Sequence, residues 1–486
     1  MKLKLKSWLI IALAGLMLIL GILIPNRIAH SQVDVRTLHL LNRITYGASP
    51  GDIEQVQSMG VKNYIQSQLS PETVPQSPQL KSKISQFRTL NLTPVQLFAQ
   101  YQPNQNMNPQ QREKARQRAG LPRREAMEAR LVRSIYSSHQ LQEVMVDFWL
   151  NHFNVFAGKG HTRLWVGNYA EKAIAPHALG NFRDLLGATA HHPAMLFYLD
   201  NDQNTAPNSP GGRRRKSGLN ENYARELMEL HTLGVDGGYT QEDVIALARI
   251  LTGWGIDRQG KYGNDGFRFF QNRHDPSNKV FLGNQIQGGG MEEGERALDI
   301  LARHPSTARF ISYKLAQYFV ADNPPNSLVN RLAQSFQATD GNIREVLATL
   351  FDSQEFWDSK YYGSKFKTPY EYIVSAVRAT GVTKPELNRL VGNLNQLGMR
   401  PYHCETPDGY PNTQDAWLNP DAMMRRIGFA YRLADRGVSE DAPANATQVA
   451  KTLGNNFSGQ TLEVLESSPK RFRVSLLLGS PEMMRR

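Results

Sequence analysis

The chain has almost no cysteine. Cys404 is the only one among 486 residues, so no disulfide can form within the chain, and no zinc site can be built from several thiolates. Because no cysteine follows the apolar segment near the N-terminus, a lipoprotein anchor is excluded as well.

Common catalytic signatures are also missing. The chain has no HExxH sequence, no Walker A sequence and no GxSxG sequence in a strand–turn–helix context. A metal site would therefore have to be assembled from distant segments, and the sequence identifies neither a metal nor a cofactor.

Long apolar runs are absent except for one, residues 8–24. Lys2, Lys4 and Lys6 precede it, and the small-residue stretch Ala29-His30-Ser31 follows. This pattern predicts that residues 1–31 are a signal peptide or an N-terminal membrane anchor. We expect residues 32–486 to be exported, to the periplasm or the outer face of the cytoplasmic membrane, with membrane contact only through residues 8–24 if the leader stays uncleaved.

Basic residues exceed acidic ones, and the formal net charge is +12. Part of the excess is local, in residues 112–133 and in Arg213-Arg214-Arg215-Lys216. One interpretation is a solvated helix face and loop. The other is an anion-binding surface at Arg213, Arg214, Arg215 and Lys216 for an anionic envelope polymer or lipid head groups. We expect no nucleic-acid partner, because export separates the chain from nucleic acid.

The periodicity of apolar residues predicts a mainly α fold, a multi-helical globular body with one small β-hairpin. The hairpin is expected within residues 266–286, around a loop at 275–278. At this length the body 32–486 has room for two lobes, 32–360 and 361–486. Residues 200–218 are rich in Asn, Pro, Gly and Arg, which predicts a mobile loop with nothing to bury.

The stretch "GLNENYARELMELHTLGVDGGYTQEDV" at 218–244 predicts a helical hairpin. Asn220 suits an N-cap, Gly234 suits the position after the helix, and Thr240 with Asp243 resembles a capping box. Tyr223, Leu227 and Leu230 form one apolar stripe.

The charges of this stretch allow two interpretations. Glu221, Arg225 and Glu229 are four residues apart, which is typical of a solvated ion-pair ladder. Alternatively, Arg225 and Glu226 belong to a buried polar site, because Glu226 flanks the apolar stripe. We take the second interpretation as the hypothesis to test.

Three histidines add to these charges. His152 lies in "DFWLNHF", His192 precedes a proline at a helix boundary, and His274 lies in the predicted hairpin loop. Each has a purely structural interpretation as a hydrogen-bonded core or turn residue. Together with Arg225 and Glu226 they are the candidate catalytic residues of a His/carboxylate/Arg cleft.

Several long segments of the chain resemble, in order, those of the bacterial domain-of-unknown-function family 1800. The segments are "LLNRITYGASPGDIEQV", "DFWLNHFNVF", "PHALGNFRDLLGATAHHPAMLFYLDN", "NENYARELMELHTLGVDGGYTQEDVIALARILTGW", "HDPSNKVFLG" and "GYPNTQDAWLN". The resemblance implies an exported, mostly helical bacterial protein, and it implies no reaction.

Two functions from different classes follow. The first is an exported cell-envelope enzyme with a cleft lined by the five candidate residues. The second is a non-catalytic envelope scaffold or binding module that contacts an anionic polymer or lipid. Convergence of the five side chains in one pocket favours the enzyme, and their dispersal favours the scaffold.

Overall fold

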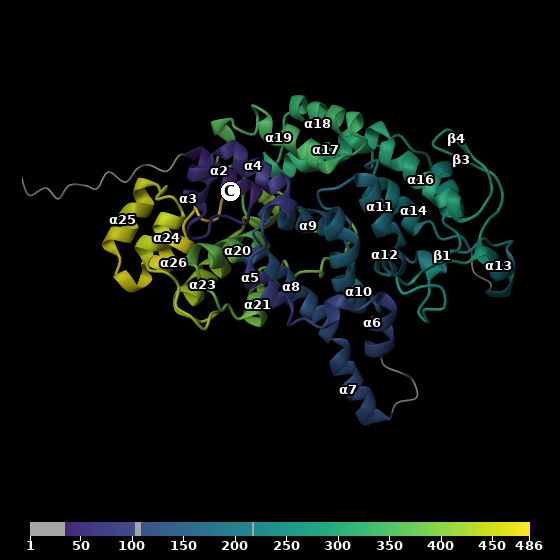
Figure 1. Ribbon diagram of the computed structural model, residues 1–486, viewed down its shortest axis with the longest axis horizontal. Coiled ribbons are helices and arrows are strands. Elements are labelled where there is room, and N and C mark those ends of the chain that lie inside the picture. The colour runs from purple at the N-terminus through teal and green to yellow at the C-terminus, as the bar shows by residue number, and fades with distance from the viewer. Residues whose placement is uncertain (1–34, 103–107, 216–217) are drawn as a thin grey trace, which may run out of the picture.

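The computed structural model describes residues 35–102, 108–215 and 218–486. The predicted leader lies outside these ranges. Within them the chain is mainly helical, as the apolar spacing predicts, with two small antiparallel sheets toward one end (Figure 1). No helix in these ranges is long and apolar enough to cross a membrane.

Three helices in the first part of the chain begin at capping residues. Ser77, Thr93 and Asn108 each accept a hydrogen bond from a backbone N–H of the first turn, and a proline follows each of them. The last helix of this part projects away from the body (Figure 1). The elements are α2 (Val35–Ile44), α3 (Asp52–Met59), α4 (Val61–Leu69), η1 (Pro71–Thr73), α5 (Pro78–Ile84), η2 (Thr89–Asn91), α6 (Pro94–Tyr101) and α7 (Pro109–Ala119).

The next part contains the two long helices α8 and α9, which meet at a sharp break. The Gln140 side-chain amide donates to the carbonyls of Ser134 and Ser137 across this break. The turn brings the buried Arg130 within 3.0 Å of Glu143. The elements are α8 (Leu121–Tyr136), α9 (Gln140–His152), α10 (Thr162–Asn168), η3 (Tyr169–Ile174), η4 (Ala175–His177), α11 (Phe182–His191), α12 (Pro193–Tyr198), η5 (Asn201–Gln203) and α13 (Pro210–Arg215).

The predicted helical hairpin is confirmed as α14 (Asn222–Glu229) and α15 (Gln241–Ile250). The Asn220 side chain accepts a backbone N–H at the start of α14. Gly234 has a φ of 83°, which suits glycine where the chain turns back. Thr240 and Asp243 form a capping box at the start of α15.

The small β-hairpin is present, but the pairing within residues 266–286 differs from the prediction. The second run forms a hairpin with itself, around Leu282 and Gly283, which have positive φ angles of 46° and 73°. A two-residue turn of this kind matches the twist of the strands. The first run pairs instead with an earlier strand. The elements are β1 (Trp254–Ile256), β2 (Phe267–Phe269), η6 (Gln271–Arg273), β3 (Lys279–Phe281) and β4 (Asn284–Ile286), with order β1-β2 and β3-β4.

In Figure 1 the remaining helices run from α16 at the right, across the top, to the left of the view. Helix α20 is buried along its whole length, so side chains on every face of it contact protein. The elements are α16 (Met291–Arg303), α17 (Pro305–Phe319), α18 (Asn326–Ala338), α19 (Ile343–Asp352), η7 (Ser359–Tyr361), α20 (Pro369–Thr380), α21 (Leu387–Gln396), α22 (Gln414–Trp417), α23 (Pro420–Ala434), α24 (Ala446–Thr452), α25 (Gly459–Ser467), η8 (Lys470–Phe472) and α26 (Arg473–Leu478).

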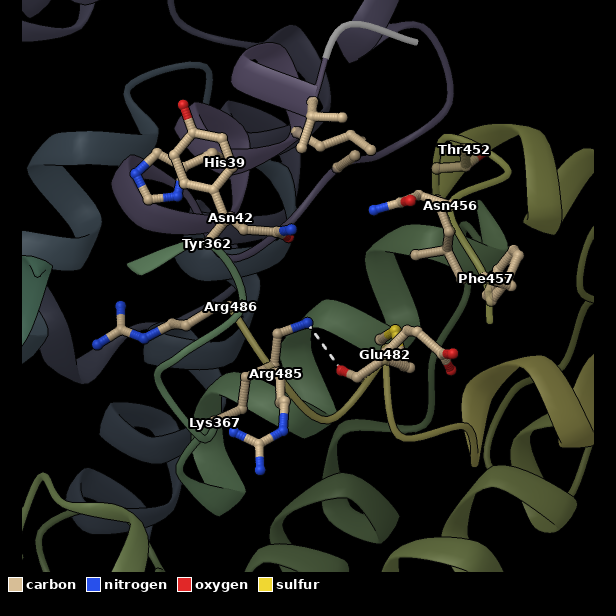
Figure 2. A pocket seen from close by; sticks show the side chains of 16 residues that line it. His39, Asn42, Tyr362, Lys367, Thr452, Asn456, Phe457, Glu482, Arg485 and Arg486 are labelled. Carbon is tan, nitrogen blue, oxygen red and sulfur yellow. Dashed lines mark hydrogen bonds between the residues drawn. The ribbon is translucent and has the colours of Figure 1, made fainter. Parts of the chain in front are cut away.

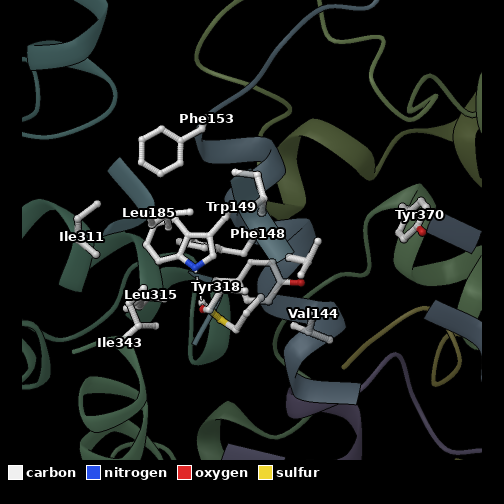
Figure 3. Packing of buried hydrophobic residues seen from close by; sticks show 14 of the residues in the cluster. Val144, Phe148, Trp149, Phe153, Leu185, Ile311, Leu315, Tyr318, Ile343 and Tyr370 are labelled. Carbon is white, nitrogen blue, oxygen red and sulfur yellow. Dashed lines mark hydrogen bonds between the residues drawn. The ribbon is translucent and has the colours of Figure 1, made fainter. Parts of the chain in front are cut away.

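One large hydrophobic cluster runs through the molecule. Figure 3 shows Trp149 of α9 surrounded by aromatic and aliphatic side chains, among them Phe153, Leu185 and Ile311. The Trp149 indole N–H donates to the carbonyl of Ala178 at 3.0 Å, so its polar atom is satisfied in the core. The cluster contains residues on both sides of position 360. The division into two lobes stays a prediction.

Residues 200–215 bury more than the sequence suggests. Asn201, Asn204 and Thr205 are buried, and the Asn204 side-chain amide donates to the carbonyl of Ala248. The expectation that this segment has nothing to bury is therefore wrong. The segment buries hydrogen-bonded polar side chains instead of apolar ones, and amino-acid composition does not show which polar side chains are buried.

Candidate functional site

The strongest candidate site is a cavity of about 460 Å³, which we call the central cavity. It lies between α9, α17, the start of α20 and the segment 399–413. Most of its lining residues have polar or charged side chains, and a few have aromatic rings. The lining residues are Asp147, Phe148, Asn151, His152, Lys314, Gln317, Tyr318, Thr368, Glu371, Met399, Cys404, Thr406, Asp408, Gly409, Tyr410, Pro411, Asn412 and Thr413.

The segment 399–413 is held against α9 by a pair of hydrogen bonds. The Asn151 amide donates to the Tyr410 carbonyl, and its side-chain oxygen accepts the Tyr410 N–H, both at 2.8 Å. Gly409 precedes this contact with a φ of 77°, and a Cβ atom there would lie 2.3 Å from the Asn151 carbonyl oxygen. Only glycine allows so close an approach, so Gly409 is required for the segment 399–413 to pack against α9 in this position.

Asp147 lies on the cavity side of α9, and 24% of its side-chain surface is exposed. Burial raises the pKa of Asp147 to about 6, against a weaker lowering by Arg130. The Arg130 guanidinium is 4.0 Å away, beyond hydrogen-bond distance, and it also pairs with Glu143. A carboxyl group with such a pKa can both donate and accept a proton near neutral pH.

Glu371 is the second carboxylate of the cavity, and α20 holds it in place. It is the third residue of a capping box, where one oxygen accepts the Thr368 N–H at 2.8 Å. The other oxygen accepts the Tyr318 hydroxyl at 3.2 Å and lies 3.0 Å from the Arg486 guanidinium. Glu371 is therefore a fixed, ion-paired carboxylate rather than a mobile one.

Lys314 and the thiol of Cys404 also line the central cavity. Burial lowers the pKa of Lys314, while Asp408 acts in the opposite direction. Burial raises the pKa of the Cys404 thiol. Since the thiolate is the nucleophilic form of cysteine, Cys404 is a poor nucleophile here.

Of the five residues predicted as catalytic, His152 lines the central cavity. One ring nitrogen lies 3.0 Å from the His231 carbonyl oxygen, and the ring packs among Phe148, Trp149 and Phe153. Burial lowers the pKa of His152 well below its ordinary value. His152 is thus neutral at physiological pH, and we expect it to donate its proton to the His231 carbonyl.

His192 and His274 lie in other surroundings. His192 caps α12 by accepting the Ala194 N–H, and its other nitrogen lies 3.0 Å from the Asn168 side-chain oxygen. His274 is buried, with one nitrogen 2.9 Å from Glu293 and the other 2.9 Å from the Thr252 carbonyl oxygen. Both histidines have the contacts of structural residues.

The burial predicted for Arg225 is wrong. Its side chain is 38% exposed, and it lies 3.4 Å from both Glu221 and Glu229, as in the ladder interpretation. Gln241 of α15 extends the ladder by accepting from Arg225 at 2.9 Å. Glu221, Glu229 and Gln241 thus hold Arg225 at the surface, where ion pairs contribute little to stability.

Glu226, like Arg225, is half-buried. Burial, together with the charges of Glu229 and Asp408, raises its pKa. Asp408 of the segment 399–413 is thus near enough to Glu226 to affect its pKa. Its catalytic role stays a prediction.

The predicted anion-binding cluster is described in part. Arg213 and Arg214 are exposed on α13, and the Arg213 guanidinium donates to the Asn208 carbonyl at 2.8 Å. The side chain of Arg215 and the whole of Lys216 lie outside the described residues. The exposed pair leaves the anion-binding interpretation open as a prediction.

The sequence did not single out Asp147, Glu371, Lys314 or Asp408. Asp147 stands in the same short motif as His152, but its helical position alone does not reveal a cavity. The Thr368–Glu371 spacing indicates a capping box, but it does not indicate that the Glu371 carboxylate also lines a cavity. Among the described residues, no three His, Cys, Asp or Glu side chains gather as metal ligands would.

The neutral histidines predict an acid-sensitive fold, and His192→Asn tests this. Burial lowers the pKa of folded His192 from 6.5 to about 3. Between these values the unfolded chain binds one more proton, so the stability that is present above pH 6.5 is lost as the pH falls. Asparagine keeps the cap acceptor and does not titrate.

We therefore expect the free energy of unfolding of His192→Asn to fall less steeply with acid, by about 1.4 kcal/mol per pH unit between pH 5.5 and 4. Urea denaturation of both proteins across this range measures the two slopes. Equal slopes would show that His192 takes up its proton in the folded protein.

A search of family models matches residues 39–485 to DUF1800, described as a protein of unknown function. No curated protein and no solved structure matches the chain.

Proposed function

The chain belongs to the DUF1800 family, and we propose that it is an exported cell-envelope enzyme whose central cavity performs acid–base catalysis. The observation that carries the proposal is Asp147, a carboxyl group with a pKa near 6 that borders a cavity of about 460 Å³. Perturbed carboxyl groups in clefts are typical of catalytic acids and bases.

The proposed roles follow from the contacts. Asp147 exchanges a proton with the substrate, because burial raises its pKa more than the Arg130 guanidinium, 4.0 Å away, lowers it. Glu371, fixed by Arg486 and Tyr318, supplies a stationary negative charge that stabilises a positive charge developing in the transition state. Lys314 supplies a donor on another wall of the cavity.

The lining also favours a class of substrate. Amide, hydroxyl and carboxylate groups line the cavity together with the rings of Phe148, Tyr318 and Tyr410. This mixture suits a neutral polyhydroxylated substrate, since hydroxyl groups bind polar side chains and the apolar face of a sugar ring packs on an aromatic ring. We propose a sugar unit of an envelope polymer, in keeping with the predicted export.

The test is Asp147→Asn. We expect a loss of function of at least about 100-fold, because general acid–base catalysis typically contributes that much. Stability should not fall, since the folded protein disfavours the charge at this position and asparagine removes it. Complementation of a deletion strain measures function, and thermal melting measures stability.

Asp184→Asn is the matched control, because Asp184 is an exposed carboxylate on α11. It should leave both readouts unchanged. Infrared titration adds a direct check, in which a carboxyl band that titrates near pH 6 disappears only from Asp147→Asn. Full complementation by Asp147→Asn would remove the proposed catalytic acid.

Exposed Arg213 and Arg214 support a second candidate function. In this proposal the protein is a non-catalytic module, and α13 contacts an anionic envelope polymer or lipid head groups. Replacement of both arginines by glutamine would then abolish binding to anionic vesicles or polymer, whereas Asp147→Asn would not affect it.

A further inference from the structure

Lys367 is a buried lysine that has no ion pair with any residue the structure describes. Lysine is rarely buried unless it is paired. Two other lysines are as buried, and each has a carboxylate partner: Lys279 with Glu293, and Lys365 with Asp322. Among the described residues, no carboxylate lies within 4.0 Å of the Lys367 amine.

Neutral groups hold the Lys367 amine in position. It donates to the Ser375 hydroxyl at 2.8 Å and to the Met483 carbonyl at 2.9 Å. Glu371 raises the pKa of Lys367 from a longer distance. Its carboxylate is paired with Arg486. Burial lowers the pKa of Lys367 to about 7, as expected of an amine that lacks a counterion.

The amine borders a second cavity, of about 330 Å³, which we call the side cavity. Figure 2 shows the Lys367 amine directed toward the space below Asn42, with Asn456 and Phe457 on the opposite side. Leu38, Leu453 and Phe457 give the cavity an apolar wall, while Asn42 and Asn456 add amide groups. The side cavity therefore combines the Lys367 amine with an apolar wall.

Glu482 also lines this cavity, but its carboxylate is occupied. It accepts the Ser458 N–H at 2.8 Å, and both of its oxygens lie 3.1 Å from the Thr461 hydroxyl. In Figure 2 the carboxylate points away from the Lys367 amine. Arg485, a further lining residue, adds positive charge.

We propose that the side cavity binds a small organic carboxylate, with the carboxylate on the Lys367 amine and the apolar body against Leu38, Leu453 and Phe457. A carboxylate supplies the counterion that Lys367 lacks, and a charge-assisted hydrogen bond of this kind is strong in a buried site. The volume supports an apolar body, since a dry cavity of about 150 Å³ already holds benzene.

Hexanoate, hexan-1-ol and acetate separate the contributions in calorimetric titrations of the full chain. Hexanoate combines both features of the proposed ligand, hexan-1-ol has only the apolar body, and acetate has only the charge. We expect hexanoate to bind the wild-type protein at least about tenfold more tightly than either of the other two.

Lys367→Met tests the role of the amine. Methionine has a similar length and no charge, so the variant should melt no lower than the wild type. Its affinity for hexanoate should fall at least about tenfold, while its affinity for hexan-1-ol stays unchanged. Lys172→Met, which removes an exposed lysine elsewhere, should bind all three compounds like the wild type.

Leu453→Trp gives a test that does not depend on Lys367. Filling the cavity should abolish the binding of both hexanoate and hexan-1-ol. Equal affinity of the wild type for hexanoate and hexan-1-ol would overturn the proposal, as would unchanged hexanoate binding by Lys367→Met or by Leu453→Trp.

Discussion

Replacement of Glu293 by alanine should lower the free energy of unfolding by about 3–5 kcal/mol. Although burial raises its pKa, hydrogen bonds from His274, Lys279 and the Gly289 N–H hold the pKa of Glu293 below its ordinary value. Lys279 has no exposed side-chain surface. Removal of Glu293 would leave that ammonium group buried without its counterion, and His274 would lose a partner as well.

Glu292→Ala is the matched control, because Glu292 is the exposed neighbour on the same helix. It should change stability by no more than about 0.5 kcal/mol. Urea denaturation measures both variants, and an unchanged dependence on urea concentration would show that the unfolded state is the same. A Glu293→Ala protein as stable as Glu292→Ala would mean that water or a rearranged side chain compensates Lys279.

Replacement of Glu371 by alanine should cost a similar amount, about 3–5 kcal/mol, and should also abolish the proposed activity. The change removes the capping box of α20, the partner of the buried Arg486 and the acceptor for Tyr318. It removes the fixed negative charge of the central cavity at the same time. Thermal melting and complementation measure the two effects.

Gln448→Ala separates the cap from the buried charge. Gln448 occupies the same capping-box position in α24 but is exposed and uncharged. Its replacement should cost only about 1 kcal/mol, the usual contribution of a cap. If Glu371→Ala costs no more than Gln448→Ala, Arg486 has found another partner and the ion pair is dispensable.

Local features of the fold were predictable from sequence, because they depend on a few adjacent residues. The capping box at Thr240 and the turn at Gly234 lie where the sequence places them. The N-cap of α14 is one residue later than expected, at Glu221, and the Asn220 side chain accepts the Asn222 N–H just before it. The two-residue turn at Leu282-Gly283 was missed, because leucine rarely adopts a positive φ and gives no turn signal.

The candidate site was less predictable, because burial decides what each side chain does. Arg225 and Asp147 are both charged residues on amphipathic helices, yet one lies in a surface ladder and the other borders a cavity. The difference comes from segment 399–413, which packs beside Asp147 from more than 250 positions away. Helical periodicity within α9 contains no information about that segment.

The long distance in sequence between the segments that line the central cavity also affects how the protein folds. The central cavity needs α9, α17, α20 and segment 399–413, and Arg486 must reach Glu371. Contacts so distant in sequence carry a large loop-closure entropy and tend to form late in folding. A partly folded chain would therefore have long stretches of correct helix and no cavity. Any chemistry at this site would begin only once distant parts of the chain have come together.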